Sequence, residues 1–193
     1  VQHISAYSLM YEEGTPLFRL LNEKKIKEIN EETSLKMYEM LIESLTNNGF
    51  EHYEISNFAL PGYRSKHNSS YWKQIPYLGI GASAHSYNIV SRQWNISDVK
   101  DYIRFVNSSS HEYIEETEHL TDTERYNDII TTTLRTSDGI DTRTLPQRHR
   151  DFILKASQKH IALGNLSLDN GIIRLTRQGL FISDSIMVDL IEE

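Results

Sequence analysis

The segment Lys66–Tyr87 reads KHNSSYWKQIPYLGIGASAHSY and is the most informative stretch of this chain. It places two histidines, three tyrosines, a tryptophan and a Gly-Ile-Gly turn in one short loop-rich segment. Surface loops are usually built from Gly, Pro, Asn, Asp and Ser rather than from large aromatic side chains. We therefore expect this loop to fold over something, and the residues leave open whether that is a core, a partner or a flat ligand.

The sequence before this segment predicts a strand–helix–strand unit. His3–Leu9 alternates polar and apolar residues, Asn30 can cap a helix that runs to about Asn48, and Phe50–Phe58 alternates again. Short joins between such elements predict a right-handed, parallel βαβ unit. In parallel sheets the ligand site lies beyond the carboxyl ends of the strands. The aromatic segment follows the second strand directly, so we expect it on the functional side.

The sequence after the aromatic segment predicts a boundary between two domains. Tyr77–Tyr87 is expected to be a third extended segment, and Ser97 can cap a helix from Asp98 to about Val106. The serine run at positions 108–110 indicates a linker. We therefore divide the chain into domains 1–110 and 111–193.

The second domain has the sequence pattern of helices followed by a small β-wing. Thr121 and Glu124 form a capping box for a helix to about Thr136, and a further helix is expected from about Arg148 to Leu163. Asp169-Asn170-Gly171 lies between two short apolar runs, which is typical of a β-hairpin. Thr176 can cap a final helix. These elements predict a winged-helix-like module.

The composition of the 193 residues is that of a globular protein, with 38% hydrophobic and 24% charged residues. No apolar run approaches the roughly 20 residues that span a bilayer, and the N-terminal residues lack the features of a signal peptide. The chain has no cysteine, which excludes disulfides, thiolate zinc sites and a thiolate-ligated iron–sulfur cluster within it. The absence of cysteine favours a cytoplasmic location.

The charge of the chain is unevenly distributed. The formal net charge of −7 argues against affinity of the whole chain for nucleic acid. Residues 141–180, however, carry about +4, from seven basic and three acidic side chains. The basic ones are Arg143, Arg148, Arg150, Lys155, Lys159, Arg174 and Arg177. This basic patch is interpreted as a solvated face, or as a contact for haem propionates, an anionic membrane surface or an acidic partner; nucleic-acid binding is the least favoured interpretation.

Four motifs in order resemble the C-terminal part of radical S-adenosylmethionine proteins related to oxygen-independent coproporphyrinogen III oxidase. They are HISAYSL followed by EEGTP, GFEHYEISNFALPGY at Gly49–Tyr63, HNSSYW at His67–Trp72 followed by YLGIGASAHS, and RLTRQGLFISDSIM at Arg174–Met187. The resemblance covers nearly the whole chain. The HN-two-residues-YW pattern is similar to that of the haem-chaperone subgroup rather than to the oxidase proper.

The resemblance implies an α/β fold, α+β overall, formed by the C-terminal part of a partial (β/α)6 radical S-adenosylmethionine barrel and a helical, winged-helix-like domain. It also implies that the full-length parent holds a [4Fe–4S] cluster and cleaves S-adenosylmethionine. Because this chain has no cysteine, we expect the cluster motif N-terminal to Val1 and no radical activity from the chain alone. A barrel opened in this way exposes a strand edge through which the chain is expected to self-associate.

The haem-binding residues implied by the resemblance are His67, Asn68, Tyr71 and Trp72. His67 is the candidate axial ligand of the haem iron, because a neutral imidazole is a good iron ligand. Tyr71 and Trp72 follow closely enough to stack on a porphyrin or to hydrogen-bond to it. The structural alternative is a histidine held by backbone carbonyls in an ordered loop.

A second group of candidates faces the S-adenosylmethionine pocket in the resemblance: Ser8, Gly79, Gly81 and His85. The structural alternative for the glycines is a tight crossing of a barrel strand, because a missing side chain allows close backbone approach. His85 also remains open as the iron ligand in place of His67. Glu54 and Asn57 are interpreted as groups that orient a cofactor, as interior salt-bridge partners or as part of a solvated face.

Three functions are compatible with these observations. The first is haem binding and delivery to acceptor proteins. The second is oxygen-independent coproporphyrinogen III oxidase activity in porphyrin biosynthesis, which decarboxylates the propionate side chains of coproporphyrinogen III oxidatively. The third is a nucleic-acid-binding winged module, although no nucleic-acid partner is expected from the net charge. The resemblance favours the first.

Overall fold

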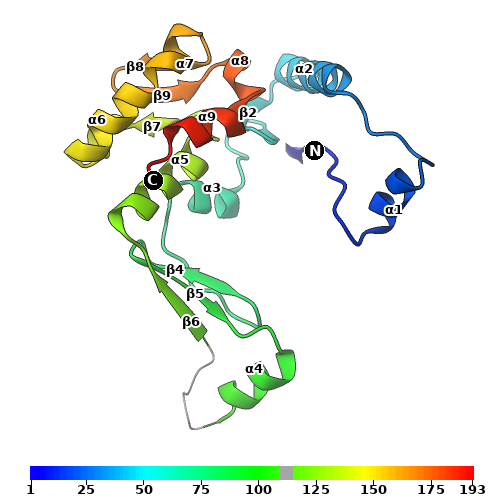
Figure 1. Cartoon of the computed structure of the whole chain (residues 1–193), viewed down its shortest axis with the longest axis vertical. Helices are drawn as coiled ribbons and strands as arrows, with labels where there is room; N and C mark the ends of the chain where they lie inside the picture. The colour runs from blue at the N-terminus through cyan, green and yellow to red at the C-terminus, as the bar shows by residue number, and fades with distance from the viewer. Residues whose placement is uncertain (109–114) are drawn as a thin grey trace. The chain divides into compact units, whose positions relative to one another are not determined.

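A computed structural model describes residues 1–108 and 115–193 of the chain. These residues form two compact units, Val1–Ser65 and Lys66–Glu193 (Figure 1). Most of the expected serine linker, and with it the expected domain boundary between positions 110 and 111, lies outside the described residues. The division into domains 1–110 and 111–193 therefore stays a prediction.

The first unit contains a three-stranded antiparallel sheet in the order β1-β3-β2. Its strands are β1 (His3–Ser5), β2 (Glu51–Glu54) and β3 (Asn57–Ala59). The prediction of a single strand over Phe50–Phe58 is wrong, because the chain reverses between β2 and β3 to form a hairpin. The predicted βαβ pairing is also wrong: β1 and β2 run in the same direction, but β3 lies between them.

Two helices complete the first unit, α1 (Pro16–Asn22) and α2 (Glu31–Asn47). The predicted cap is confirmed, because the Asn30 side chain accepts a hydrogen bond from the backbone N–H of Thr33 at 2.8 Å. The Tyr38 hydroxyl on α2 donates to the Ile55 carbonyl at 2.6 Å and so ties the helix to the turn of the hairpin. The core of this unit is formed by buried Ile42, Tyr53, Phe58 and Ala59.

The second unit begins with helix α3 (Lys66–Trp72) and a twisted antiparallel ribbon. The ribbon consists of β4 (His85–Tyr87), β5 (Ser91–Asn95) and β6 (Glu115–His119), and helix α4 (Val99–Val106) lies near one end of it (Figure 1). The helical content of Lys66–Trp72 corrects the prediction that this segment is a loop. The predicted strand Tyr77–Tyr87 is largely irregular: only its last three residues form β4, and Tyr77 makes an isolated bridge to Tyr87.

The C-terminal part of the second unit packs helices around a small antiparallel sheet. Its elements are α5 (Asp122–Thr133), β7 (Ile140–Asp141), the 3-10 turn η1 (Thr142–Thr144), α6 (Gln147–Ala156), α7 (Gln158–Ala162), β8 (Leu166–Asp169), β9 (Ile172–Leu175), α8 (Arg177–Leu180) and α9 (Ser183–Leu190). The sheet order is β7-β9-β8. This arrangement agrees with the predicted α+β fold and its helical, winged C-terminal part.

Local signals predicted several features of this part correctly. The capping box of Thr121 and Glu124 is present, and the β8–β9 hairpin turns at Asn170 and Gly171, whose φ angles of 49° and 78° suit these residues. The expected helix from Arg148 to Leu163 is two helices that meet at Ser157. The core is closed by fully buried apolar side chains from α5 and its C-cap, α6, β9 and α9: Ile130, Leu134, Ile153, Ile173, Ile186 and Leu190. None of the helices in the described residues is long and apolar enough to cross a membrane.

Candidate functional site

His67 and Tyr71 form a contact pair on one face of α3. They are four residues apart, which places their side chains one above the other on a helix. The Tyr71 hydroxyl lies 3.0 Å from Nε2 of His67, and the two rings meet edge-on with centroids 4.9 Å apart. Both side chains are exposed, Tyr71 by 38%. The imidazole nitrogen that reaches furthest from the helix is therefore occupied by a phenol and not by a backbone carbonyl.

A row of tyrosines continues from this pair into the interior of the second unit. Tyr71 meets Tyr77 edge-on at 4.8 Å, and Tyr77 lies 6.1 Å from Tyr87, which is only 8% exposed. Burial is the main reason why the pKa values of the Tyr77 and Tyr87 phenols are raised. The phenols stay neutral at physiological pH, so the row offers a rigid, uncharged aromatic wall beside His67.

Asn68 and Trp72 lie on the same short helix, one residue after His67 and Tyr71. Both are half-buried. The Trp72 carbonyl accepts a hydrogen bond from the Thr133 hydroxyl at 3.1 Å, so the end of α3 is fastened to the end of α5. This attachment gives the exposed pair a fixed base. The roles of Asn68 and Trp72 in ligand binding stay predictions.

The glycines of the Gly-Ile-Gly turn have structural reasons to be glycine. A Cβ atom added at Gly79 would lie 2.2 Å from the backbone oxygen of His85, so the two segments cross too closely for a side chain. Gly81 has a φ of 115°, which side chains rarely tolerate, and its N–H donates to the Tyr102 hydroxyl at 3.1 Å. This geometry supports the strand-crossing interpretation.

The wall of the expected S-adenosylmethionine pocket is not assembled within one unit. Ser8 lies beyond β1 in the first unit and is exposed, whereas Gly79, Gly81 and His85 belong to the second. These four residues therefore come from two separate units, and their position in one wall stays a prediction.

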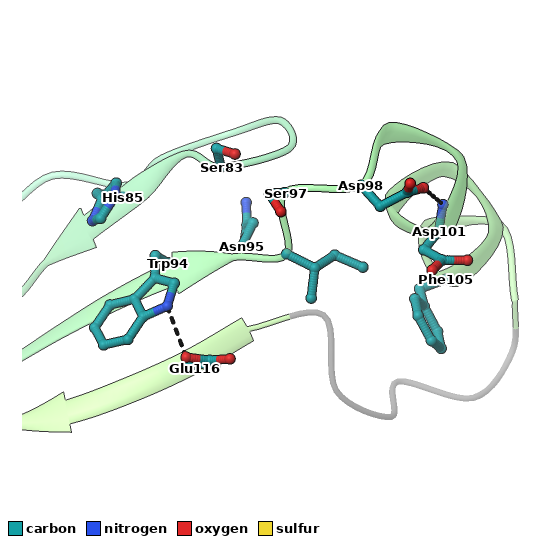
Figure 2. Close-up of a pocket in the computed structure, with 10 residues that line it drawn as sticks. Ser83, His85, Trp94, Asn95, Ser97, Asp98, Asp101, Phe105 and Glu116 are labelled. Carbon is teal, nitrogen blue, oxygen red and sulfur yellow. Dashed lines mark hydrogen bonds between the residues drawn. The ribbon is translucent and has the colours of Figure 1, made fainter. Parts of the chain in front are cut away.

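His85 itself lines a pocket of about 420 Å³ in the second unit (Figure 2). It lies opposite Trp94 in the β4–β5 pairing, with ring centroids 6.0 Å apart. The pocket is lined by Ser83, His85, Trp94, Asn95, Ile96, Ser97, Asp98, Asp101, Phe105 and Glu116. Among these, sequence reasoning singled out only His85 as a candidate site residue. The other lining residues could have been found only from the cross-strand pairing of Trp94 with Glu116. That pairing depends on the register of β5 against β6, which the sequence does not show.

Glu54 and Asn57 are buried structural partners in the first unit, 3% and 1% exposed. The Glu54 carboxylate accepts hydrogen bonds from the backbone N–H of Ser56 at 2.9 Å and from the Asn57 side chain at 2.5 Å. Asn57 in turn accepts from the Ser5 hydroxyl at 2.6 Å. This network holds the β2–β3 turn against β1, which supports the structural interpretation of both residues.

Two further histidines are buried in the winged part and have structural partners. His149 stacks on Tyr126 with centroids 4.7 Å apart, and its Nδ1 lies 2.9 Å from a Glu192 carboxylate oxygen. Nε2 of His160 lies 2.9 Å from Asp189. In the described residues, no group of three or more His, Asp or Glu side chains is placed to hold a metal ion.

Five of the seven side chains of the basic patch form ion pairs or hydrogen bonds within the chain. Ion pairs join Arg143 to Asp141, Arg148 to Glu192, and Lys159 to Asp189. The guanidinium of Arg150 donates to the carbonyls of Thr142 and Arg143, and that of Arg174 to the carbonyl of Ser137. Side chains engaged in this way have fewer donors left for phosphates, which weakens the argument for a nucleic-acid-binding module.

The comparison with solved structures shows the fold that this chain shares with a known protein. The chain is similar to the structure described as "Coproporphyrinogen III oxidase (HemN) from Escherichia coli is a Radical SAM enzyme", with a TM-score of 0.66 and 17% identity over 98% of this chain and 48% of that one. At this identity the likeness shows the fold. A family model for the HemN C-terminal domain matches residues 120–182.

Several relatives with similar sequences are named as heme chaperones or as radical S-adenosyl methionine domain-containing proteins. The heme chaperone HemW of Bacillus subtilis is 29% identical over 189 residues, which cover 96% of this chain and 50% of the relative. HemW of Lactococcus lactis is 38% identical over 102 residues, or 53% of this chain and 27% of the relative. Mouse radical S-adenosyl methionine domain-containing protein 1, mitochondrial, is 28% identical over 99% of this chain and 46% of its own length.

Along nearly its whole length the chain is therefore similar to the C-terminal part of HemN/HemW-type radical S-adenosylmethionine proteins. The chain spans about half the length of the relatives that it matches along its whole length.

Proposed function

We propose that this chain supplies the haem-holding part of a protein that binds haem and delivers it to acceptor proteins. The observation that carries the proposal is the exposed His67–Tyr71 pair at the start of the tyrosine row. An imidazole is a suitable axial ligand for haem iron, and aromatic rings can cover a porphyrin face. Relatives named heme chaperone support this choice.

The Tyr71 hydroxyl has a definite part in the proposed site. Because it occupies Nε2 of His67, iron binds through this nitrogen only when the hydroxyl moves away. The hydrogen bond and the iron therefore compete for one nitrogen atom. Such competition lowers haem affinity and favours release, which suits a carrier better than a protein that retains its haem.

The residues of this chain do not supply the ligands for the iron–sulfur cluster of the parent protein. Radical S-adenosylmethionine relatives imply S-adenosylmethionine and a [4Fe–4S] cluster in the full-length protein. Thiolates hold such clusters, and this chain has no cysteine to supply them. Together, the cluster and S-adenosylmethionine would supply reductive radical chemistry, while the residues of this chain would hold the haem.

The second candidate is oxygen-independent coproporphyrinogen III oxidase. It is favoured by the shared fold with the Escherichia coli protein of that name. The oxidase would decarboxylate coproporphyrinogen III when full length, with turnover insensitive to His67→Ala. The carrier proposal requires haem binding that depends on His67.

Several properties of the parent protein stay predictions. The cytoplasmic location is one, because the relatives include proteins named as mitochondrial. Contact with an anionic membrane surface, self-association through a strand edge and the identity of the haem acceptors are the others.

A haem titration followed by visible absorbance tests the proposal. We expect saturable binding with a shifted Soret band for the wild-type chain and its loss in His67→Ala. His119→Ala is a matched control, because His119 is also an exposed histidine of the second unit. Binding retained in His67→Ala but lost in His85→Ala would move the ligand to His85 and refute the assignment of His67. No binding by a folded wild-type chain would refute the proposal that these residues suffice.

A further inference from the structure

The pocket between the β4–β5–β6 ribbon and α4 has the chemistry of a receptor for an organic cation. We infer that it binds a small molecule carrying an ammonium or guanidinium group. The inference goes beyond haem binding and does not depend on it, because it uses none of the residues of α3. The volume of about 420 Å³ lies in the range of small-molecule sites.

Aromatic rings form part of the wall of this pocket. Trp94 on β5 and His85 on β4 lie opposite each other, and Phe105 approaches from α4 (Figure 2). The face of a tryptophan ring is the best aromatic partner for a cation. The Trp94 ring is fixed for this purpose, because its Nε1 donates to the Glu116 carboxylate at 2.9 Å.

Three carboxylates supply the charge: Asp98, Asp101 and Glu116. Asp98 caps α4 by accepting from the backbone N–H of Asp101 at 2.8 Å, and this bond fixes the carboxylate without neutralising it. Of the three carboxylates, Asp101 forms an ion pair with Arg104, whose guanidinium lies 2.9 Å away. The lining therefore has more negative than positive charge, which favours a cationic ligand and disfavours an anion.

The pocket is distinct from the wall expected from the family resemblance. Of those four residues only His85 lines it, and Ser8, Gly79 and Gly81 do not. Haem, an anion through its propionates, is also unsuited to a wall with three carboxylates. The site therefore calls for a ligand of its own, with cationic groups toward Glu116 beside Trp94 and toward Asp98 at the start of α4 (Figure 2).

Fluorescence offers a direct test, because the chain has two tryptophans, Trp72 and Trp94. In a Trp72→Phe background all tryptophan emission comes from the pocket. Agmatine, which carries a guanidinium and an ammonium group, is the probe. We expect a saturable change in emission, and dissociation constants at least about threefold higher in Glu116→Gln and in Asp98→Ser, since each loses a charge but keeps a hydrogen-bond acceptor.

Glu118→Gln is the matched control for these variants. Glu118 is on the same strand but pairs with Arg92 outside the pocket, so its removal should leave agmatine binding unchanged. Circular dichroism confirms that each variant is folded. The inference is overturned by no response to agmatine in the folded chain, or by equal binding in Glu116→Gln and Asp98→Ser. S-adenosylhomocysteine, whose sulfur carries no charge, is the competing ligand. Tighter binding of this compound than of agmatine would indicate a site for the adenosyl group and would also overturn the inference.

Discussion

Replacement of Tyr71 by phenylalanine should tighten haem binding, if His67 is the axial ligand. The change removes the hydroxyl that lies 3.0 Å from Nε2 of His67 and keeps the ring that packs edge-on against Tyr77 at 4.8 Å. A hydrogen bond of this kind contributes about 0.5–1.5 kcal/mol net, and every 1.4 kcal/mol is tenfold in affinity. Because Tyr71 is 38% exposed, water partly replaces the lost bond, and the effect falls toward the lower end. We expect affinity about two- to fivefold higher.

The assay is a competition titration, in which a haem-binding protein of known affinity gives up haem to wild type, Tyr71→Phe or Tyr63→Phe. Tyr63 is an exposed tyrosine of the first unit and controls for the loss of a surface hydroxyl. Haem release from Tyr71→Phe to an acceptor should also be slower, since the competing hydroxyl is gone. Weaker binding by Tyr71→Phe would refute the reasoning, because it would mean that the phenol supports the haem instead of competing with the iron.

Two further predictions concern stability. Gly79→Ala should lower the free energy of unfolding by about 1–3 kcal/mol, because the new Cβ meets the His85 backbone at 2.2 Å. Urea unfolding should show a larger loss than for Ile80→Ala, a neighbouring change at a side chain that is 84% exposed, and equal losses would contradict the crossing. Hydrogen bonds from Arg143 hold the pKa of the Asp141 carboxyl at about 2, below the value of about 3.9 in an unfolded chain. The pair therefore stabilises the fold fully above about pH 3.9, and this stabilisation is lost as the pH falls toward 2. Urea midpoints between about pH 5 and pH 2 should therefore fall less steeply in Arg143→Gln than in wild type, and parallel curves would speak against the pair.

Pairing between distant segments limited what could be predicted about the first unit. The alternation in FEHYEISNF is the same for one strand as for two short strands joined by a tight reversal. The reversal is stabilised by the side chains of Glu54 and Asn57, whose contacts include Ser5 from the other end of the unit. A partner about 50 residues away in the sequence leaves no local signal, so the parallel βαβ pairing was the wrong choice.

The candidate site, too, was predicted only in part from the sequence. His67 and Tyr71 were assigned from the sequence to one candidate site, but their helix was predicted as a loop. A short helix poor in apolar residues depends on attachments such as that of Trp72 to Thr133, which leave no local signal. The pocket at His85 was not predicted, because His85 was assigned from the sequence to a different wall, together with Ser8, Gly79 and Gly81. Its other main residues, Trp94, Phe105 and Glu116, come from different elements and meet only through the register of the ribbon and the position of α4.

The sequence by itself indicated the family resemblance and the candidate haem ligand, and it determined the caps at Asn30 and Thr121 and the hairpin at Asn170-Gly171. The caps and the hairpin depend on residues close together in the chain, where a side chain satisfies a backbone group a few positions away or a residue suits a turn conformation. Only the tertiary structure decided that the histidine nitrogen is held by a phenol, that three side chains of the basic patch form ion pairs, and that three carboxylates line the same pocket as Trp94. The physical reason is that these interactions join segments whose approach is set by burial of the core and strand register, which no local pattern encodes.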